Sequence, residues 1–356
     1  MISASRLALV AAAGLSVAAC SHLPKPSLPL PKKEASAPAI PEAPPLAGPK
    51  ITDLKPGQWA QALSDVAPDP SWRFGTLPNG MRYAIRKNAT PPGQASLRLW
   101  FDAGSMMEAD DQQGLAHFLE HMAFNGSKNV PEGEMVKILE RHGLAFGADT
   151  NAQTSFDETA YQLDLPKTDD DTVDTSLMLL REAAGELTIA PDAVDRERGV
   201  VLSEERTRNT PGYRVAIQTL SAQMEGQLPP KRIPIGKTDV LKTAPAQRIR
   251  DFYEAYYRPE RAVLVAVGDF DVDAMEAKIK GRFGDWAGKG QPGKNPDVGA
   301  VAKRGATAKL IVEAGAPWTV QMTWARQPDG LLETKAVDER DMLENLGFAV
   351  LNRRLQ

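Results

Sequence analysis

The chain has 356 residues, a formal net charge of −4 and a single cysteine. This length is enough for about two domains, each with its own hydrophobic core. The negative charge argues against nucleic acid as a partner, because nucleic-acid-binding domains are usually basic. With Cys20 alone, the chain can form neither an intrachain disulfide nor a cysteine-based zinc site. Any metal site must therefore use histidine and carboxylate ligands.

Residues 1–20 are typical of a bacterial lipoprotein signal peptide. Arg6 supplies a positive start, and residues 7–17 form an apolar run that is too short to span a bilayer. The run ends in Val-Ala-Ala-Cys, which resembles the lipobox, where cleavage precedes a lipidated cysteine. An incidental buried cysteine fits less well with these small residues. We expect lipidation of Cys20 and, because Ser21 follows it, anchoring to the outer membrane on the periplasmic side.

Residues 21–68 are rich in proline, alanine, serine and lysine. Such a composition buries too little apolar surface to order itself, and proline-rich linkers are extended. We therefore expect a disordered spacer that holds the folded part away from the membrane.

A globular pattern begins at about residue 69 and continues to 287. Residues 81–86 alternate apolar and polar side chains after a Pro-Asn-Gly turn, and residues 97–101 repeat the alternation. This period of two predicts half-buried strands of an antiparallel sheet. The continuous apolar run at 262–267 predicts a strand that is buried on both faces.

The stretch GLAHFLEHMAFN at 114–125 carries the strongest chemical signal. His117 and His121 are four residues apart, so on a helix both imidazoles project from one face and can hold one Zn²⁺. Glu120 is then placed to accept a proton from a water on the metal. A lone histidine on a helix is more often structural. Here, two of only four histidines share the motif, which chance would produce in about 1 of 300 such chains.

Further elements follow this helix. His142 closes the next predicted helix, where a cation suits the dipole, and we interpret it as a surface residue rather than a ligand. The acidic run at 169–171 is interpreted as a solvated helix start rather than as a metal site. The remaining predictions are helices at 131–142, from 168 onward and at 192–209, and a strand pair at 144–151 and 157–165.

A catalytic zinc site needs a third protein ligand, and the helix at 192–209 offers glutamates. Glu197 and Glu204 are seven residues apart and share one stripe, whereas Glu205 points about 100° away from Glu204. Two glutamates on a charged helix are usually surface residues, so the sequence alone leaves both interpretations open.

With both helices considered, the sequence resembles the pitrilysin/insulysin family of inverted zinc peptidases, whose signature is His-x-x-Glu-His followed by a helical glutamate. The resemblance covers residues 72–286. It implies that Glu204 is the third zinc ligand and that Glu197 is a supporting catalytic carboxylate. It also implies that Asn151, Ala152 and Gln153 lie on an edge strand that binds substrate as an added β-strand.

The C-terminal part predicts the beginning of a second, similar domain. A Gly/Lys/Pro linker at 288–305 precedes predicted strands at 308–313 and 319–324 and a helix at 338–355, so we interpret 306–356 as an incomplete domain. Family members carry a complete second domain and a further half, which supplies an Arg/Tyr pair. The resemblance therefore implies a partner half or subunit.

The sequence predicts an α+β domain that hydrolyses oligopeptides or unfolded segments in the bacterial envelope with Zn²⁺. One alternative is a proteolytically silent, peptide-binding subunit that needs a partner half. Another is a structural lipoprotein with the same fold, which would hold no stoichiometric zinc.

Overall fold

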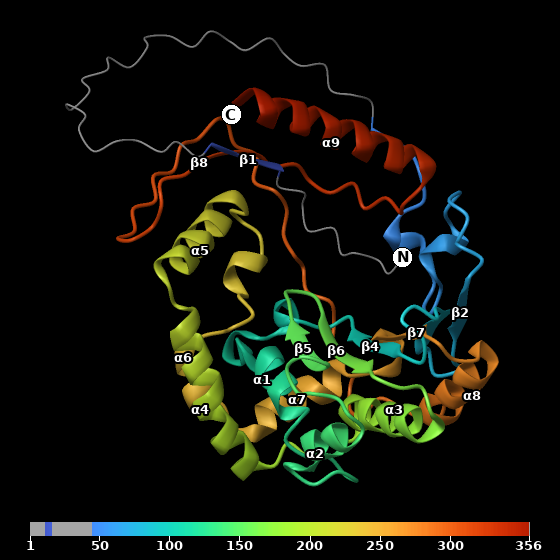
Figure 1. Ribbon diagram of the computed structural model, residues 1–356. Coiled ribbons are helices and arrows are strands. Elements are labelled where there is room, and N and C mark those ends of the chain that lie inside the picture. Colours follow the sequence, from blue (N-terminus) through green and yellow to red (C-terminus); the bar gives the residue numbers. More distant parts are fainter. Residues whose placement is uncertain (1–10, 16–44, 356) are drawn as a thin grey trace, which may run out of the picture.

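The computed structural model describes residues 11–15 and 45–355. At its centre is one six-stranded sheet with the order β2-β3-β7-β4-β6-β5 (Figure 1). Neighbouring strands are antiparallel except for the parallel pair β3 and β7. The strands are β2 Trp72–Thr76, β3 Arg82–Lys87, β4 Ala95–Phe101, β5 Thr150–Thr154, β6 Thr159–Leu165 and β7 Ala262–Gly268.

The alternation in the sequence determines which face of the sheet is buried. On β4, Leu97, Leu99 and Phe101 are fully buried, whereas Arg98 and Trp100 on the other face are partly exposed. β7 contains the apolar run and lies between β3 and β4 in the middle of the sheet, as expected for a strand without polar alternation. Burial on both faces is only partly correct, because Val265 and Val267 are half-buried. The predicted α+β class is confirmed.

Helices cover the buried face. Helices α1 and α3 pack on β6, and α8 packs on β3 (Figure 1). Asp169 and Asp271 cap the helices α3 and α8 by accepting hydrogen bonds from the backbone of the first turn. Asp169 is therefore a helix cap, as the interpretation of the acidic run required. The helices of this part are α1 Leu115–Met122, α2 Glu134–Arg141, α3 Asp170–Gly185, α4 Pro191–Arg208, α5 Pro211–Gln223, α6 Thr238–Thr243, α7 Ala246–Tyr256 and α8 Val272–Phe283.

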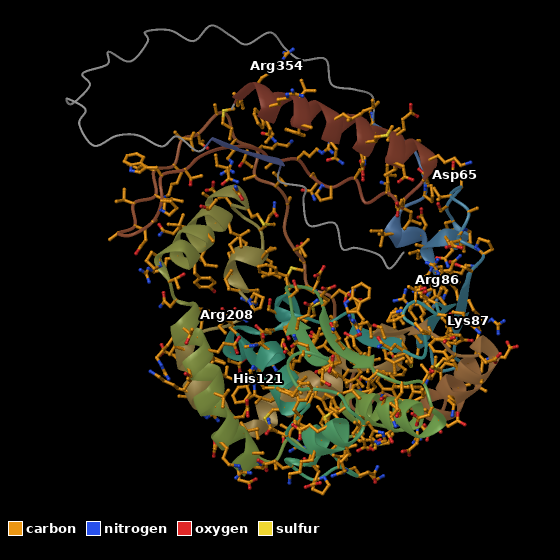
Figure 2. The ribbon with its side chains drawn as sticks, viewed as in Figure 1. Asp65, Arg86, Lys87, His121, Arg208 and Arg354 are labelled. Carbon is orange, nitrogen blue, oxygen red and sulfur yellow. The ribbon has the colours of Figure 1, made fainter. Side chains whose placement is uncertain are left out.

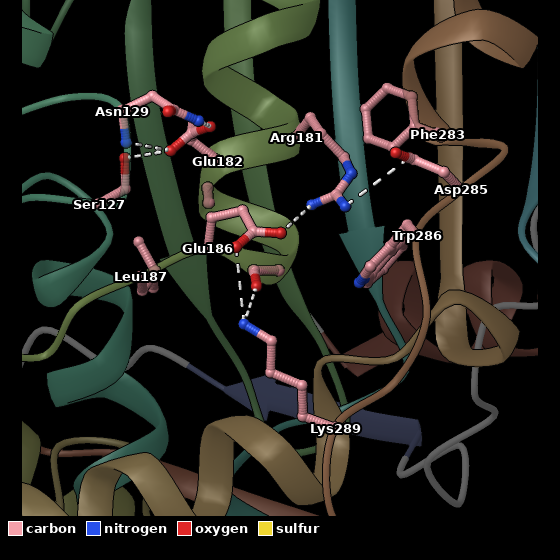
Figure 3. A network of polar contacts seen from close by, with 12 residues as sticks. Ser127, Asn129, Arg181, Glu182, Glu186, Leu187, Phe283, Asp285, Trp286 and Lys289 are labelled. Carbon is pink, nitrogen blue, oxygen red and sulfur yellow. Dashed lines mark hydrogen bonds and ion pairs between the residues drawn. The ribbon is translucent and has the colours of Figure 1, made fainter.

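A polar network joins helix α3 to two loops (Figure 3). The buried carboxylate of Glu182 accepts hydrogen bonds from Ser127 Oγ at 2.6 Å and from Asn129 N and Nδ2 at 3.1 and 2.6 Å. Near the end of the helix, Lys289 Nζ donates to Gly185 O at 2.7 Å. The network fixes the loop after α1 and the segment after α8 against the same helix.

The last part of the chain is separate from the six-stranded sheet. β8 Val320–Trp324 pairs antiparallel with β1 Ala11–Leu15, and helix α9 spans Lys335–Leu355 (Figure 1). The strand predicted at 308–313 is wrong: no described strand pairs with this segment, and Leu310 and Val312 are 83% and 80% exposed. The first strand predicted at 144–151 is shifted, because β5 begins only at Thr150 after a turn.

The described part of the predicted linker, residues 45–68, differs from the expected extended spacer. It contains two short 3₁₀ helices, Ile51–Asp53 and Ala60–Ala62. Ile51 N donates to Gly330 O at 2.9 Å and Ser64 Oγ to Glu333 O at 2.6 Å, so this segment contacts the C-terminal part. The lipidation site predicted at Cys20 lies outside the described residues. None of the helices in the described ranges has the length and hydropathy needed to cross a membrane.

Candidate metal centre

Helix α1 lies between α4, α7 and strand β5, which buries almost all of it. Leu115, Phe118, Leu119 and Met122 are fully buried and fill the core side. On its other side, His117 and Glu120 are only 6% and 9% exposed. The hydrophobic packing of one face therefore presents the His-x-x-Glu-His side chains toward α4 and β5.

Three side chains from α1 and α4 converge at one point. His117 Nε2 and His121 Nε2 are 3.3 Å apart, and Glu204 Oε2 lies 3.5 Å from the first and 3.3 Å from the second. Ligand atoms bound tetrahedrally to Zn²⁺ at about 2.0–2.1 Å are separated by about 3.3 Å. The three atoms thus have the spacing of three corners of a zinc tetrahedron. Within residues 11–15 and 45–355, this is the only group of three or more potential ligands.

Glu197, one of the two glutamates considered on α4, contacts the other ring nitrogen of His121. His121 Nδ1 lies 2.8 Å from Glu197 Oε1, and Asn125 Nδ2 donates to Glu197 Oε2 at 3.1 Å. The hydrogen bond from His121 is the main reason why the pKa of Glu197 is lowered. An ionised Glu197 selects the tautomer with the proton on Nδ1, so Nε2 of His121 has a free lone pair for a metal.

The two histidines differ in protonation behaviour. Burial, together with the positive charge of a protonated His121, lowers the pKa of His117 to about 4, so its ring is neutral at pH 7. For His121, burial lowers the pKa, but the hydrogen bond to Glu197 and the charges of Glu120 and Glu204 outweigh it and raise the pKa. His117 Nδ1 is buried without a hydrogen-bond partner.

Glu120 lies beside the three converging atoms and contacts strand β5. Thr154 Oγ1 donates a hydrogen bond to Glu120 Oε2 at 2.6 Å, which leaves Oε1 for another partner. Burial raises the pKa of Glu120, and the Thr154 hydroxyl opposes this shift. A carboxylate with a raised pKa next to a metal site is suited to accepting a proton from water.

Arg208 was not predicted from the sequence. It follows Glu204 by one helical turn, and its Nη2 lies 2.6 Å from Glu204 Oε1. This ion pair occupies one carboxylate oxygen and leaves Oε2 facing the imidazoles. Figure 2 labels Arg208 on α4 and His121 on α1, on the two elements that form the site. The spacing of four residues was visible in the sequence, but only the fold shows that this pair belongs to the site.

The predicted substrate-binding residues Asn151, Ala152 and Gln153 lie on β5, at the edge of the sheet. They therefore share an element with Thr154, which contacts Glu120. His142 does not join the site: its Nδ1 lies 3.3 Å from Thr172 Oγ1, on α3.

The fold and the set of donor atoms are those of an inverted zinc peptidase. Comparisons with known proteins lead to the same class. Residues 83–229 match the family described as Insulinase (Peptidase family M16), and residues 243–351 match the Peptidase M16 inactive domain. Together the two matches span more than half of the chain. The chain belongs to the peptidase M16 family, which confirms the resemblance to pitrilysin and insulysin.

Relatives with assigned names fall in the same class. A probable zinc protease PqqL of Haemophilus influenzae is 40% identical over 212 residues, which are 60% of this chain and 23% of that protein. A zinc protease PQQL-like protein of Arabidopsis thaliana is 33% identical over 79% of this chain and 30% of its own length. The chain thus spans less than a third of these relatives. Both relatives are named as zinc proteases, which agrees with the predicted Zn²⁺ and with the predicted metalloprotease class.

A solved structure shares the fold. The crystal structure of the first half of the periplasmic protease PqqL from Escherichia coli is 33% identical, with a TM-score of 0.63. The similarity covers 66% of this chain and 50% of that one.

The contact between Glu197 and His121 leads to a test. Replacing Glu197 with glutamine removes the charge that holds the His121 tautomer, so we expect zinc affinity to fall by about 10–100-fold. Competition with a chromophoric chelator measures it. Glu205→Gln, on the same helix, is the matched control and should leave the affinity unchanged. An equal loss of zinc affinity in Glu197→Gln and Glu205→Gln would contradict the role assigned to the contact between Glu197 and His121.

Proposed function

We propose that the chain is the zinc-binding part of a metallopeptidase that hydrolyses peptide bonds in oligopeptides or unfolded segments. His117, His121 and Glu204 hold the metal, Glu120 is the general base, and Glu197 supports His121. The observation that carries the proposal is the set of donor-atom distances of 3.3–3.5 Å. The buried Glu120 carboxylate interacts electrostatically with His121 and Glu204 of this set.

When bound, Zn²⁺ would supply a Lewis acid that acidifies water and polarises a peptide carbonyl. The remaining work falls to the chain. Glu120 takes the proton from the attacking water and can return it to the leaving amine, while Thr154 Oγ1 holds Oε2 of the same carboxylate in place. Arg208 keeps Glu204 Oε1 occupied, so that a single oxygen faces the metal.

The peptide substrate is proposed to bind along β5. The hydrogen bonds from Asp164 N to Asp149 O and from Ser155 N to Glu158 O bracket the ladder between β5 and β6. By the alternation of an antiparallel ladder, the peptide groups of Asn151 and Gln153 face β6, and those of Ala152 and Thr154 face the open edge. An extended peptide can pair with these groups and so reach Glu120 without sequence-specific contacts.

The location follows from the relative with a solved structure and from the N-terminal sequence. That relative is described as a periplasmic protease, which supports a periplasmic location. A lipid on Cys20 that anchors the chain to the outer membrane is our proposal from the lipobox-like sequence.

The lipid anchor is tested by Cys20→Ala, which removes the thiol that would carry the lipid. This variant should no longer incorporate labelled fatty acid, whereas the unchanged chain should, and labelling that persists in Cys20→Ala would contradict the anchor.

A second candidate function rests on the share of the relatives that the chain spans. Since the chain covers 50% or less of the relatives compared above, and residues 243–351 match a domain described as inactive, a peptide-binding part that needs another half is the alternative. Cleavage of a quenched peptide by the chain alone favours the first function. Zinc and peptide binding with cleavage only after addition of the other half of the protein favours the second.

The role of Glu120 is tested by Glu120→Gln, which keeps the shape and removes the proton acceptor. We expect one zinc per chain to remain, and peptide cleavage to fall by about 10²–10⁴-fold, the usual contribution of a general base. Metal analysis and a quenched-peptide assay measure the two quantities, in the chain alone or with its other half. The exposed Glu140→Gln, on α2, is the control. Retained cleavage in Glu120→Gln would refute the assigned base.

Substrate binding through the backbone of β5 is tested by Ala152→Pro, which removes the N–H that faces the open edge. Without a peptide, this N–H donates to Asn151 Oδ1 at 2.9 Å, a bond that a paired peptide would replace. Proline is tolerated on an edge strand, so the fold should survive. We expect kcat/KM to fall at least about tenfold, the effect of about one lost hydrogen bond to an extended peptide. Gln153→Ala removes only a side chain and should change kcat/KM little. The opposite order of effects would favour side-chain recognition instead.

A further inference from the structure

The zinc helix α1 begins without a cap of its own. Its N-cap residue is Gly114, in the left-handed region at φ 100°, and no side chain there bonds to the first turn. The first N–H groups of a helix have no partner within the helix, so a buried start needs another acceptor.

Glycine at this position is imposed by packing. A Cβ on Gly114 would lie 2.9 Å from Gly236 Cα, and a Cβ on Gly236 would lie 2.3 Å from Gly114 Cα. Gly236 also has a positive φ of 80°. Two backbones thus touch where the capping side chain would normally be, so the acceptor must come from elsewhere in the chain.

Glu108 supplies that acceptor. Its Oε1 accepts hydrogen bonds from Gly114 N at 3.0 Å and Ala116 N at 2.8 Å, and its Oε2 lies 3.0 Å from Gly114 N. The residue is 3% exposed, and burial raises the pKa of its carboxyl to about 8, against the effect of these N–H groups and of Arg232. Burying a carboxylate costs free energy unless hydrogen bonds compensate for the loss of water. The burial of Glu108 at the start of α1 therefore indicates that its bonds to the first turn have a role.

Arg232 holds the Glu108 loop in turn. Arg232 Nε donates to Glu108 O at 3.0 Å, and Arg232 Nη2 lies 2.7 Å from Asp110 Oδ1. Ser105 Oγ donates to Arg232 O at 2.5 Å. The loop before α1 and the segment before α6 are therefore joined at Ser105 and Asp110, on both sides of Glu108 in the sequence, and at the backbone of Glu108 itself.

We propose that Glu108 is a positioning residue for the metal centre, acting through the first turn of α1. His117 directly follows Ala116, whose N–H is held by Glu108. Loosening this turn moves His117 relative to His121, which lies in the last turn of the same helix. The three-atom spacing at the metal therefore depends on a carboxylate that touches neither the metal nor the substrate. This inference rests on the zinc site of the proposed function.

The test compares two buried glutamates. Glu108→Leu removes both acceptor oxygens from the start of α1, and Glu182→Leu does the same at the loop of Ser127 and Asn129. Both variants should lower the melting temperature of the metal-free chain. Only Glu108→Leu should weaken zinc binding, by about tenfold or more, and alter the visible absorption spectrum of the Co²⁺-substituted chain. Glu108→Gln, whose amide oxygen can still accept from Gly114 N and Ala116 N, should keep most of the affinity.

Several outcomes would overturn the inference. One is a folded Glu108→Leu chain with unchanged zinc affinity and Co²⁺ spectrum; another is an equal loss of zinc in Glu182→Leu. Where Glu108→Leu does not fold, Arg232→Gln removes the bond to Glu108 O and should weaken zinc binding in the same direction. Unchanged affinity there refutes the proposal. Chelator competition needs no peptide cleavage. A chain that cleaves no peptide, alone or with its other half, would refute the peptidase function and leave this inference decidable.

Discussion

The convergence of three lone-pair-bearing atoms on α1 and α4 is the constraint on which the site depends. The contact between Glu197 and His121 Nδ1 leaves Nε2 of this ring as an acceptor, and Glu204 Oε2 is an acceptor too, 3.3 Å away. When the His121 ring is neutral, two acceptors at this distance repel each other unless a cation lies between them. In the metal-free chain a proton on His121, whose pKa is raised, removes the repulsion, and a divalent cation would take the place of this proton. Arg208, on the other oxygen of Glu204, reduces the negative charge but does not enter the space between the donors.

The sheet gives this short helix its fixed position. The buried side chains of β4 and β6 form one hydrophobic core with those of α1 and α3. At the sheet edge, β5 places Thr154 in hydrogen-bond contact with Glu120. We therefore propose two roles for β5. Its open backbone edge binds an extended peptide, and the hydroxyl of Thr154 positions the general base Glu120 by a hydrogen bond. A peptide paired with β5 would lie next to the reacting groups because both are built on the same strand.

The placement of site residues could be predicted from the sequence where the signal is local. His117, Glu120 and His121 lie on one helix, and the spacing of four residues alone aligns the two imidazoles. Glu204 needed the resemblance to a family, because nothing in a charged helix shows which acid will face another helix. Thr154, Arg208 and Glu108 were missed because their contacts exist only after the sheet and helices pack. The strand at 308–313 was mispredicted, because an apolar alternation forms a strand only where another strand is available for pairing. The boundary between the two family matches also differs from the fold, because β7 belongs to the second match and yet lies in the middle of the first sheet.

The three-ligand zinc site can be tested with crystals of the zinc-loaded chain, measured on both sides of the zinc absorption edge. We expect one anomalous peak within about 2.0–2.2 Å of His117 Nε2, His121 Nε2 and one oxygen of Glu204. A peak that lies elsewhere, or one coordinated by the two histidines with Glu204 turned away, would contradict it.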